Sequence, residues 1–342
     1  MVKNTAPRAP RLPRRQVHGV LLLDKPLGLS SNDALQKVKR LFRAEKAGHT
    51  GTLDPLATGL LPLCFGAATK FSQVSLDADK RYIATLKLGE TTTTGDAEGE
   101  VLQRRAIDPA LVNAAGIAAA CLQHTGPIEQ VPPMFSALEH AGRALYEYAR
   151  EGVEIERTPR HVTIHGIDIL QWQDDVLVLD VRCSKGTYIR TLAQDIGEAL
   201  GCGAHLIGLR RTASGGVTLA NAVTLDALQS MDEAERDALI QPSDVLLAEW
   251  PDVTLAEAEA ARFLTGLRRR VTLPNMPQVR VYGPHPAHPA DQASRILLGS
   301  AHVQGGELIP NRLLSPAEIQ GLLQQASPMA RPASPSGQVM AS

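Results

Sequence analysis

The sequence predicts an α+β fold, in which strands and helices mix without the regular alternation of a parallel α/β protein. From Tyr82 to Leu88 every second residue is apolar, which predicts a half-buried strand. From Asn32 to Arg43 the apolar residues fall on one helical stripe instead. The length of 342 residues exceeds one comfortable core and indicates two domains.

The first elements are a strand and a capped helix. Val17–Leu23 is predicted to be a short strand that ends at the turn Lys25-Pro26. Ser30 or Ser31 can cap the helix that follows. The half-buried strand at residues 82–88 comes next.

Two further helices flank another strand. Asp108-Pro109 combines an N-cap residue with proline at the first helical position, which predicts a helix ending near His124–Gly126. Val176–Cys183 is predicted to be a strand, and Gly186-Thr187 to begin the next helix. The apolar residues of that helix face the core and leave Arg190 free to point elsewhere.

Composition narrows the class of protein. The chain is 44% hydrophobic, which is ordinary for a soluble globular protein, and Leu111–Leu122 is too short to span a bilayer. The N-terminal arginines are broken by prolines and lack the apolar stretch of a secretory signal. The four cysteines form no CxxC pair, which argues against a zinc site and fits a reducing cytoplasm, the expected location.

Charge is distributed unevenly along the chain. Residues 1–90 carry 15 lysine and arginine residues against 7 acidic residues, a net charge of +8. The remainder has a net charge of −9, so the total is −1. A basic N-terminal part suits contact with phosphate groups, although Arg8–Arg15 can also be read as a solvated tail.

The segment Lys46–Gly59 places one carboxylate, Asp54, among glycines and threonines that favour a sharply turning backbone. Pro55 biases Asp54 away from helical geometry. Two interpretations remain open. Asp54 is either a nucleophile or base on a rigid loop, or the cap of a helix over Pro55–Leu61.

Residues 48–59, GHTGTLDPLATG, resemble the signature of pseudouridine synthases of the TruB type, the tRNA pseudouridine-55 synthases. Other segments resemble further motifs of this family in the same order, namely Leu23–Asn32, the segment opening with Lys80-Arg81-Tyr82, Cys183–Arg190 and Gly203–Arg211. The similarity extends over residues 17–220, with a weaker match over residues 263–314.

The resemblance implies a central mixed, largely antiparallel sheet flanked by helices, plus a small C-terminal β-rich domain of the PUA type. We expect a disordered basic arm (1–16), a catalytic domain (17–245) with a thumb-like insertion at about 130–160, the PUA-like RNA-binding domain (246–323) and a disordered tail (324–342). The segment 284–289 departs from the PUA pattern.

The implied reaction is the isomerisation of the T-loop uridine of tRNA, position 55, to pseudouridine on a flipped-out base. It breaks the N1–C1′ bond, turns the base and rejoins it through C5. Nothing is oxidised, hydrolysed or phosphorylated, so no cofactor or metal is expected. The resemblance implies the T-stem-loop of tRNA as partner, no membrane, no required guide RNA or protein partner, and a monomer.

The resemblance also implies three catalytic residues. Asp54 is the nucleophile, Tyr82 stacks on the flipped base, and Arg190 pairs with the carboxylate, keeping it ionised by lowering its pKa. From pattern alone, Tyr82 is a half-buried strand residue and Arg190 a solvated helix residue.

Four more residues are implied to bind substrate. His49 would wedge into the T-loop, Tyr188 and Leu209 would line the uridine pocket, and Lys25 would contact phosphate or order the loop around Asp54. Without the resemblance, His49 is an incidental loop residue, and Tyr188 and Leu209 pack in the core.

Two other functions compete with this one. A non-catalytic RNA-binding or RNA-folding protein is possible on the same scaffold, but the presence of all three catalytic residues argues against it. A glycosidase-like enzyme would need a second acid close to Asp54, and the motif supplies none.

Overall fold

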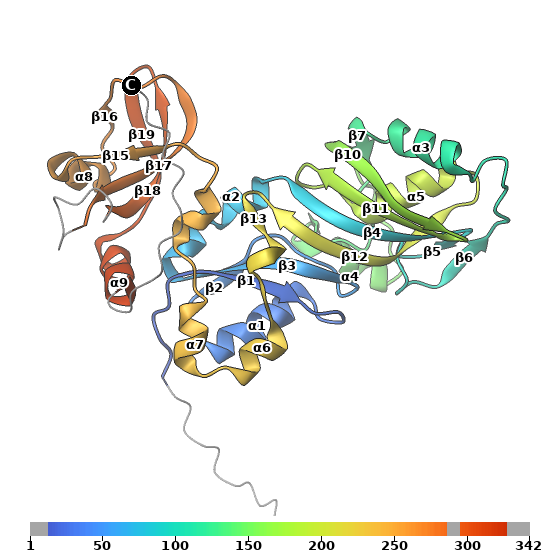
Figure 1. Ribbon diagram of the computed structural model, residues 1–342, viewed down its shortest axis with the longest axis horizontal. Helices are drawn as coiled ribbons and strands as arrows, with labels where there is room; N and C mark the ends of the chain where they lie inside the picture. The colour runs from blue at the N-terminus through green and yellow to red at the C-terminus, as the bar shows by residue number, and fades with distance from the viewer. Residues whose placement is uncertain (1–12, 286–294, 327–342) are drawn as a thin grey trace, which may run out of the picture. The chain divides into compact units, whose positions relative to one another are not determined.

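The computed structural model describes residues 13–285 and 295–326, which form two compact units (Figure 1). One unit contains Gly19–Pro251 with the residues through Arg15, and the other contains Gln16–His18 with the residues from Asp252 onward. The units therefore divide after Pro251, rather than after residue 245 as the sequence indicated.

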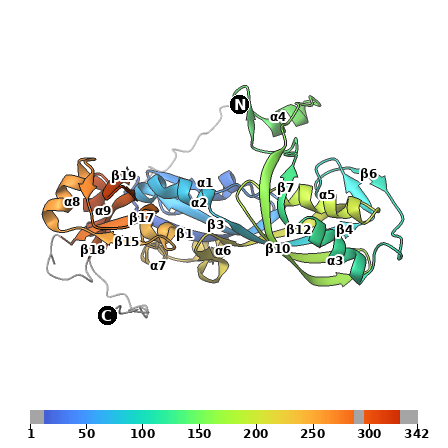
Figure 2. The ribbon, with the colours of Figure 1, turned by 90° about the horizontal axis from the view of Figure 1, so that it is seen from above.

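The larger unit is built on a mixed sheet of ten strands within the described residues (Figures 1 and 2). Its main order is β14–β1–β3–β12–β4–β11–β10–β7, with β2 beside β3 and β13 beside β12. Among the described strands of this sheet, only the pairs β1–β14 and β3–β12 are parallel. This confirms the predicted mixed, largely antiparallel sheet. The strands are β1 (Gly19–Lys25), β2 (Ala47–His49), β3 (Ala57–Phe65), β4 (Lys80–Leu88), β7 (Gly126–Gln130), β10 (Arg160–Gln173), β11 (Val176–Cys183), β12 (Ala204–Ser214), β13 (Val217–Thr218) and β14 (Val223–Thr224).

Helices flank this sheet. α5 contacts β12 and β4, α3 contacts α5 and β10, and α6 contacts β1 and β14. The α-helices of this unit are α1 (Ser31–Leu41), α2 (Ser72–Asp77), α3 (Ala114–Gln123), α4 (Leu145–Arg150), α5 (Ile189–Ala199), α6 (Leu225–Ser230) and α7 (Glu233–Ala238), joined by the 3₁₀ helices η1 (Gly66–Phe71), η2 (Leu219–Asn221) and η3 (Ser243–Leu247). Two hairpins lie outside the sheet, β5 (Glu90–Thr92) with β6 (Val101–Arg104), and β8 (Glu139–His140) with β9 (Arg143–Ala144).

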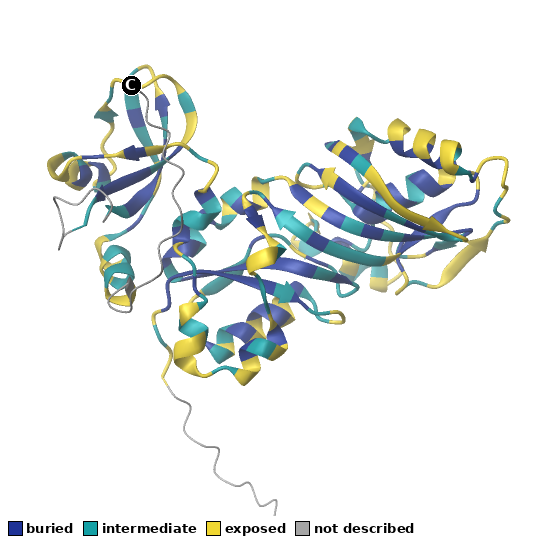
Figure 3. Cartoon of the chain, viewed as in Figure 1, coloured by how far each residue is buried: buried dark blue, intermediate teal, exposed yellow. Residues whose placement is uncertain are grey.

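The strand predicted at residues 82–88 is confirmed as β4, whose burial alternates residue by residue (Figure 3). Val20, Leu22, Leu60 and Cys64 from β1 and β3 pack in one buried cluster. The register pairs Leu22 with Pro62 and Leu23 with Leu61, so the continuous apolar run at 20–23 becomes an interior strand. Such runs are typical of strands covered on both faces.

Helix starts were predicted with mixed success. Ser30 caps α1 as expected, its side chain accepting a hydrogen bond from the backbone N of Asp33 at 3.1 Å. The helix predicted at Asp108-Pro109 is wrong at its start, because Asp108 closes a local turn onto Ala110 N and α3 begins after Asn113. α5 likewise begins at Ile189 instead of Gly186.

The smaller unit is a five-stranded sheet in the order β15–β17–β18–β19–β16. Phe263, Val279, Val281 and Leu308 lie at the centre of its core. Its elements are β15 (Asp252–Thr254), α8 (Glu257–Leu264), β16 (Arg269–Arg270), β17 (Met276–Pro284), β18 (Arg295–Gln304), β19 (Glu307–Leu313) and α9 (Pro316–Ala326). This confirms the small β-rich C-terminal domain.

Parts of the predicted arm and tail lie outside the described residues, namely 1–12 and 327–342, as does most of the segment 284–289. Within the predicted arm, Arg15 is ordered and forms ion pairs with Glu233 at 2.9 Å and Asp237 at 2.7 Å. The predicted tail also begins too early, because α9 continues to Ala326. No helix in residues 13–285 and 295–326 has the length and apolar character needed to cross a membrane.

Candidate active site

The loop that carries Asp54 joins β2 to β3 and is held from several sides. Ser31, at the start of α1, accepts a hydrogen bond from Leu53 N at 2.7 Å and donates to Leu53 O at 3.1 Å. Gly28 N donates to Pro55 O at 2.9 Å. These contacts tie the segment around Leu23–Asn32 to the Asp54 loop, so two motifs separated in sequence form one rigid unit.

Asp54 does not cap a helix. Ala57 N donates to Asp54 O at 3.0 Å, which closes a turn, and the chain continues directly into β3. The helix considered over residues 55–61 is therefore absent, and the capping interpretation is wrong. Gly59 lies in this strand, close to the neighbouring strand β12. A Cβ at this position would lie 2.3 Å from Arg211 O, and the φ of Gly59 is +96°. The close parallel pairing of β3 with β12 thus requires glycine here.

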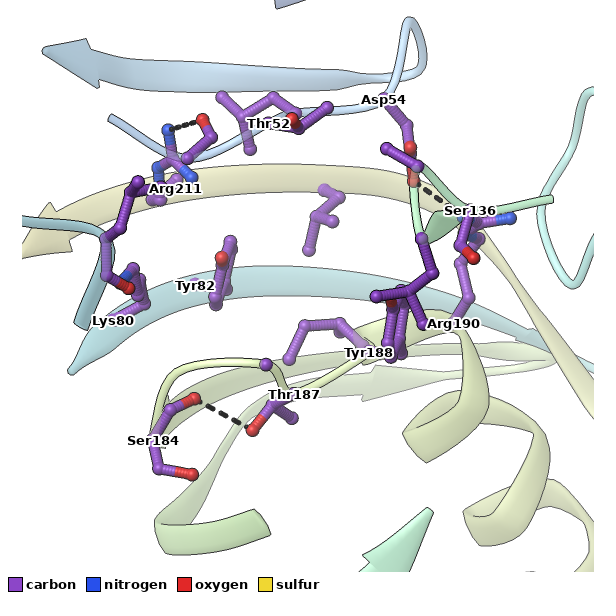
Figure 4. Close-up of a pocket in the computed structure, with 18 residues that line it drawn as sticks. Thr52, Asp54, Lys80, Tyr82, Ser136, Ser184, Thr187, Tyr188, Arg190 and Arg211 are labelled. Carbon is purple, nitrogen blue, oxygen red and sulfur yellow. Dashed lines mark hydrogen bonds and ion pairs between the residues drawn. The ribbon is translucent and has the colours of Figure 1, made fainter. Parts of the chain in front are cut away.

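Asp54 borders a cavity of about 310 Å³, large enough for a small ligand (Figure 4). Asp54 and Arg190 meet at one end of the cavity, with Tyr82 and Arg211 towards the other. The wall is built from the Asp54 loop, β4, the start of α5, β12 and the segment before the β8–β9 hairpin, and comprises Gly51, Thr52, Leu53, Asp54, Leu76, Lys80, Tyr82, Ser136, Ala137, Leu138, Ser184, Gly186, Thr187, Tyr188, Ile189, Arg190, Leu209 and Arg211.

Arg190 is the centre of the polar network. Its Nη2 lies 3.0 Å from Asp54 Oδ2, and its side chain is only 6% exposed, in contrast to the solvated position that its helix face indicated. The same guanidinium donates to Thr94 O at 3.0 Å and to Phe135 O at 2.6 Å. The network fixes Arg190 from three chain segments and so fixes the Asp54 carboxylate.

The pKa of Asp54 lies above its usual value. Desolvation by the surrounding protein is the main cause, although 38% of the side chain is exposed, and the nearby Asp96 carboxylate adds to it. The Arg190 pair lowers the pKa, as expected, and so does the charge of Lys25. The ion pair only partly offsets desolvation.

Tyr82, Tyr188 and Leu209 all line the cavity. Tyr82 lies on β4 opposite Arg211 and is 9% exposed, and burial raises its pKa. Tyr188 immediately precedes α5, where Gln130 hydrogen-bonds both its backbone N, at 3.0 Å, and its O, at 3.2 Å. Leu209 lies on β12 between β3 and β4.

Lys25 and His49 are not among the lining residues. Lys25 is fully buried, and its Nζ donates to Leu29 O at 2.5 Å and Pro26 O at 3.0 Å, so it orders the loop beside Asp54. Burial lowers the pKa of Lys25 to about 8. His49 ends β2, and burial and the Arg211 charge lower its pKa.

Sequence reasoning missed two charged residues of the site. Asp96 is buried, with Oδ2 3.7 Å from Arg190 Nε and Oδ1 accepting from Glu98 N at 3.1 Å. Arg211 is 1% exposed and donates to Leu60 O at 2.7 Å and Gly51 O at 3.1 Å. Within the described ranges, no group of three or more His, Cys, Asp or Glu side chains gathers as metal ligands would.

Comparison with known sequences identifies the family. The family model described as the N-terminal domain of TruB family pseudouridylate synthases matches residues 39–189, and the tRNA pseudouridylate synthase B C-terminal domain matches residues 190–248. A tRNA pseudouridine synthase B of Verminephrobacter eiseniae is 57% identical over 92% of this chain and 93% of its own length. That of Cupriavidus pinatubonensis is also 57% identical, over 90% of this chain and 97% of its own.

Solved structures agree at the level of the fold. The crystal structure of a Cbf5–Nop10–Gar1 complex contains a chain that matches 88% of this one over 86% of its own length, with a TM-score of 0.66 at 24% identity. A chain in the crystal structure of the archaeal box H/ACA sRNP Nop10–Cbf5 complex matches 87% of this chain over 86% of its own length, with a TM-score of 0.63 at 23% identity. Because relatives above half identity cover nearly its whole length, this chain belongs to the TruB family of pseudouridine synthases.

Proposed function

We propose that this protein isomerises the T-loop uridine of tRNA, position 55, to pseudouridine, with Asp54 as the nucleophile. The observation that carries the proposal is the Asp54–Arg190 ion pair at the end of a cavity that also contains Tyr82. A carboxylate fixed by a buried arginine beside an aromatic ring suits covalent chemistry on a flipped base. Relatives named tRNA pseudouridine synthase B support tRNA as the substrate.

The proposed steps use groups of this chain. The Asp54 carboxylate attacks the nucleotide and the N1–C1′ bond breaks. The detached base turns against the Tyr82 ring and C5 bonds to C1′. The bond between Asp54 and the nucleotide breaks, which restores the free carboxylate, and the proton that leaves C5 is replaced in the product by one on N1. The reaction conserves mass. Arg190 keeps Asp54 aimed throughout, because three further contacts hold its guanidinium in place.

The remaining residues are proposed to act on the RNA around this centre. His49 would occupy the space from which the base leaves the T-loop. Tyr188 and Leu209 would contact the uridine in the cavity. The geometry favours Lys25 as a residue that orders the loop beside Asp54, because its two hydrogen bonds are to the backbone carbonyls of Pro26 and Leu29. The segment at about 130–160 and the C-terminal unit would grip the RNA, and the enzyme would act as a monomer in the cytoplasm without a guide RNA.

Incubation with an unmodified tRNA transcript, followed by carbodiimide mapping, tests this function. We expect one pseudouridine, in the T-loop, and nearly equal modification of a minimal T-stem-loop, since RNA enzymes read exposed loops by shape. Modification elsewhere in the tRNA would refute the T-loop assignment. Reaction of full-length tRNA alone would refute local recognition.

A further inference from the structure

Ser136 is a buried residue of the cavity wall for which the proposed mechanism has no use. It lies just before the β8–β9 hairpin and is 5% exposed. Within the part of the chain that the structure describes, its Oγ makes no hydrogen bond of regular geometry and has only a looser interaction with the Tyr188 side chain. Buried hydroxyl groups are nearly always hydrogen-bonded, so this one needs an explanation.

The backbone of Ser136 is fixed, which leaves only its side chain free to choose a partner. Its N donates to Met134 O at 2.9 Å, and its O accepts from Tyr146 N at 3.1 Å. The preceding carbonyl, of Phe135, accepts from Arg190 at 2.6 Å. The residue is thus anchored to the same arginine that holds Asp54. Rotation about χ1 between staggered positions changes the direction of the hydroxyl without moving this backbone.

Ser136 also lies beside a second hydroxyl of the cavity. Burial raises the pKa of the Tyr188 phenol, and a hydrogen-bonding interaction with the Ser136 side chain lowers it by less. This interaction does not reach regular hydrogen-bond geometry, so it does not fully satisfy Ser136 Oγ. Figure 4 places both residues at the end of the cavity where Asp54 meets Arg190. Two groups that can each donate and accept therefore line the same cavity as the proposed nucleophile.

We propose that the Ser136 hydroxyl hydrogen-bonds the polar edge of the uracil ring and holds the ring while it is detached from the sugar. The inference rests on the proposed function and adds a substrate-binding residue to it. Uracil presents two carbonyl oxygens and N3–H, and pseudouridine presents N1–H as well. Because a hydroxyl donates to a carbonyl or accepts from N–H, one serine can serve the ring before and after it turns.

The test compares Ser136→Ala with Ser214→Ala. Ser214 is a matched control on β12: it is 2% exposed, its Oγ also lacks a described partner, and it does not line the cavity. For Ser136→Ala we expect the single-turnover rate at saturating enzyme to fall about tenfold, the size of one hydrogen bond in the transition state. The Kd for a T-stem-loop should stay within twofold, and Ser214→Ala should match wild type in both.

Ser136→Thr and Ser136→Val separate the hydroxyl from the volume of the side chain. These two variants have nearly the same shape, and only Thr keeps a hydroxyl, so Thr should react about tenfold faster than Val. Equal rates for Thr and Val, or a rate for Ser136→Ala within twofold of wild type, would overturn the inference and leave the proposed function standing. Failure of wild type to form pseudouridine would instead refute the proposed function.

Discussion

Replacing Arg190 with Met removes the guanidinium and keeps an apolar side chain. Four groups lose their partner: the Asp54 and Asp96 carboxylates and the carbonyls of Thr94 and Phe135. The Asp54 side chain is 38% exposed and can be rehydrated, whereas the Asp96 side chain is 4% exposed and cannot.

The expected cost follows from this difference in burial. Breaking a buried ion pair by removing one partner typically costs about 3–5 kcal/mol. We expect Arg190→Met to lower the free energy of unfolding by about 3 kcal/mol, the lower end of that range, because Asp54 regains water. The same change at Arg182, whose 3.4 Å pair with Asp168 is exposed, should cost about 0–1 kcal/mol.

Urea unfolding of the two variants measures the difference. Adding Asp96→Asn to Arg190→Met should recover part of the lost stability, because it removes the buried, unpaired charge. Equal stabilities of Arg190→Met and Arg182→Met would refute the reasoning. A double variant less stable than Arg190→Met would show that Asp96 is not the main source of the cost.

Three further predictions concern activity. Tyr82→Ala should abolish pseudouridine formation, and Tyr82→Phe should also be severely slowed if the hydroxyl moves a proton; a near-normal single-turnover rate for Phe would limit Tyr82 to stacking. Because the pKa of Asp54 is raised above 3.8, the reaction rate should fall as the pH is lowered, with a midpoint above 3.8. Asp96→Asn removes a charge that raises this pKa, so it should move the midpoint to lower pH. An unmoved midpoint would contradict this. Deleting residues 252–342 should weaken tRNA binding more than it slows single turnover, and an equal loss in both would show that the C-terminal unit shapes the active site.

Local pattern predicted the strand β4 and the cap of α1, because those elements follow from residue periodicity and one serine. It failed at Asp108, where an aspartate can close a turn as well as cap a helix, and the later Asn113 takes the cap. It also allowed a helix after Asp54. The pairing of β3 with β12, which joins residues about 150 positions apart, determines a strand there instead.

For the candidate site too, sequence motifs predicted some residues, whereas features that depend on contacts between distant segments were not predicted. The resemblance placed Asp54, Tyr82 and Arg190 in one site, and the structure brings these three to one cavity. Asp96 gave no signal in the sequence, because its relation to Arg190 depends on the folding of the β5–β6 hairpin against α5. The lowering effect of Arg190 on the Asp54 pKa was expected, but the larger effect of desolvation was not, since the degree of burial depends on the assembled cavity wall.

Pseudouridine formation by Asp54→Asn tests the central claim most directly. Asn keeps the size of Asp and removes the charge and most of the nucleophilicity. The variant should therefore fold, bind tRNA about as tightly as wild type and form no pseudouridine under single-turnover conditions. Asp54→Glu, which moves the carboxylate by about 1 Å, should be slowed about 100-fold. Near-normal pseudouridine formation by Asp54→Asn would contradict the proposed mechanism.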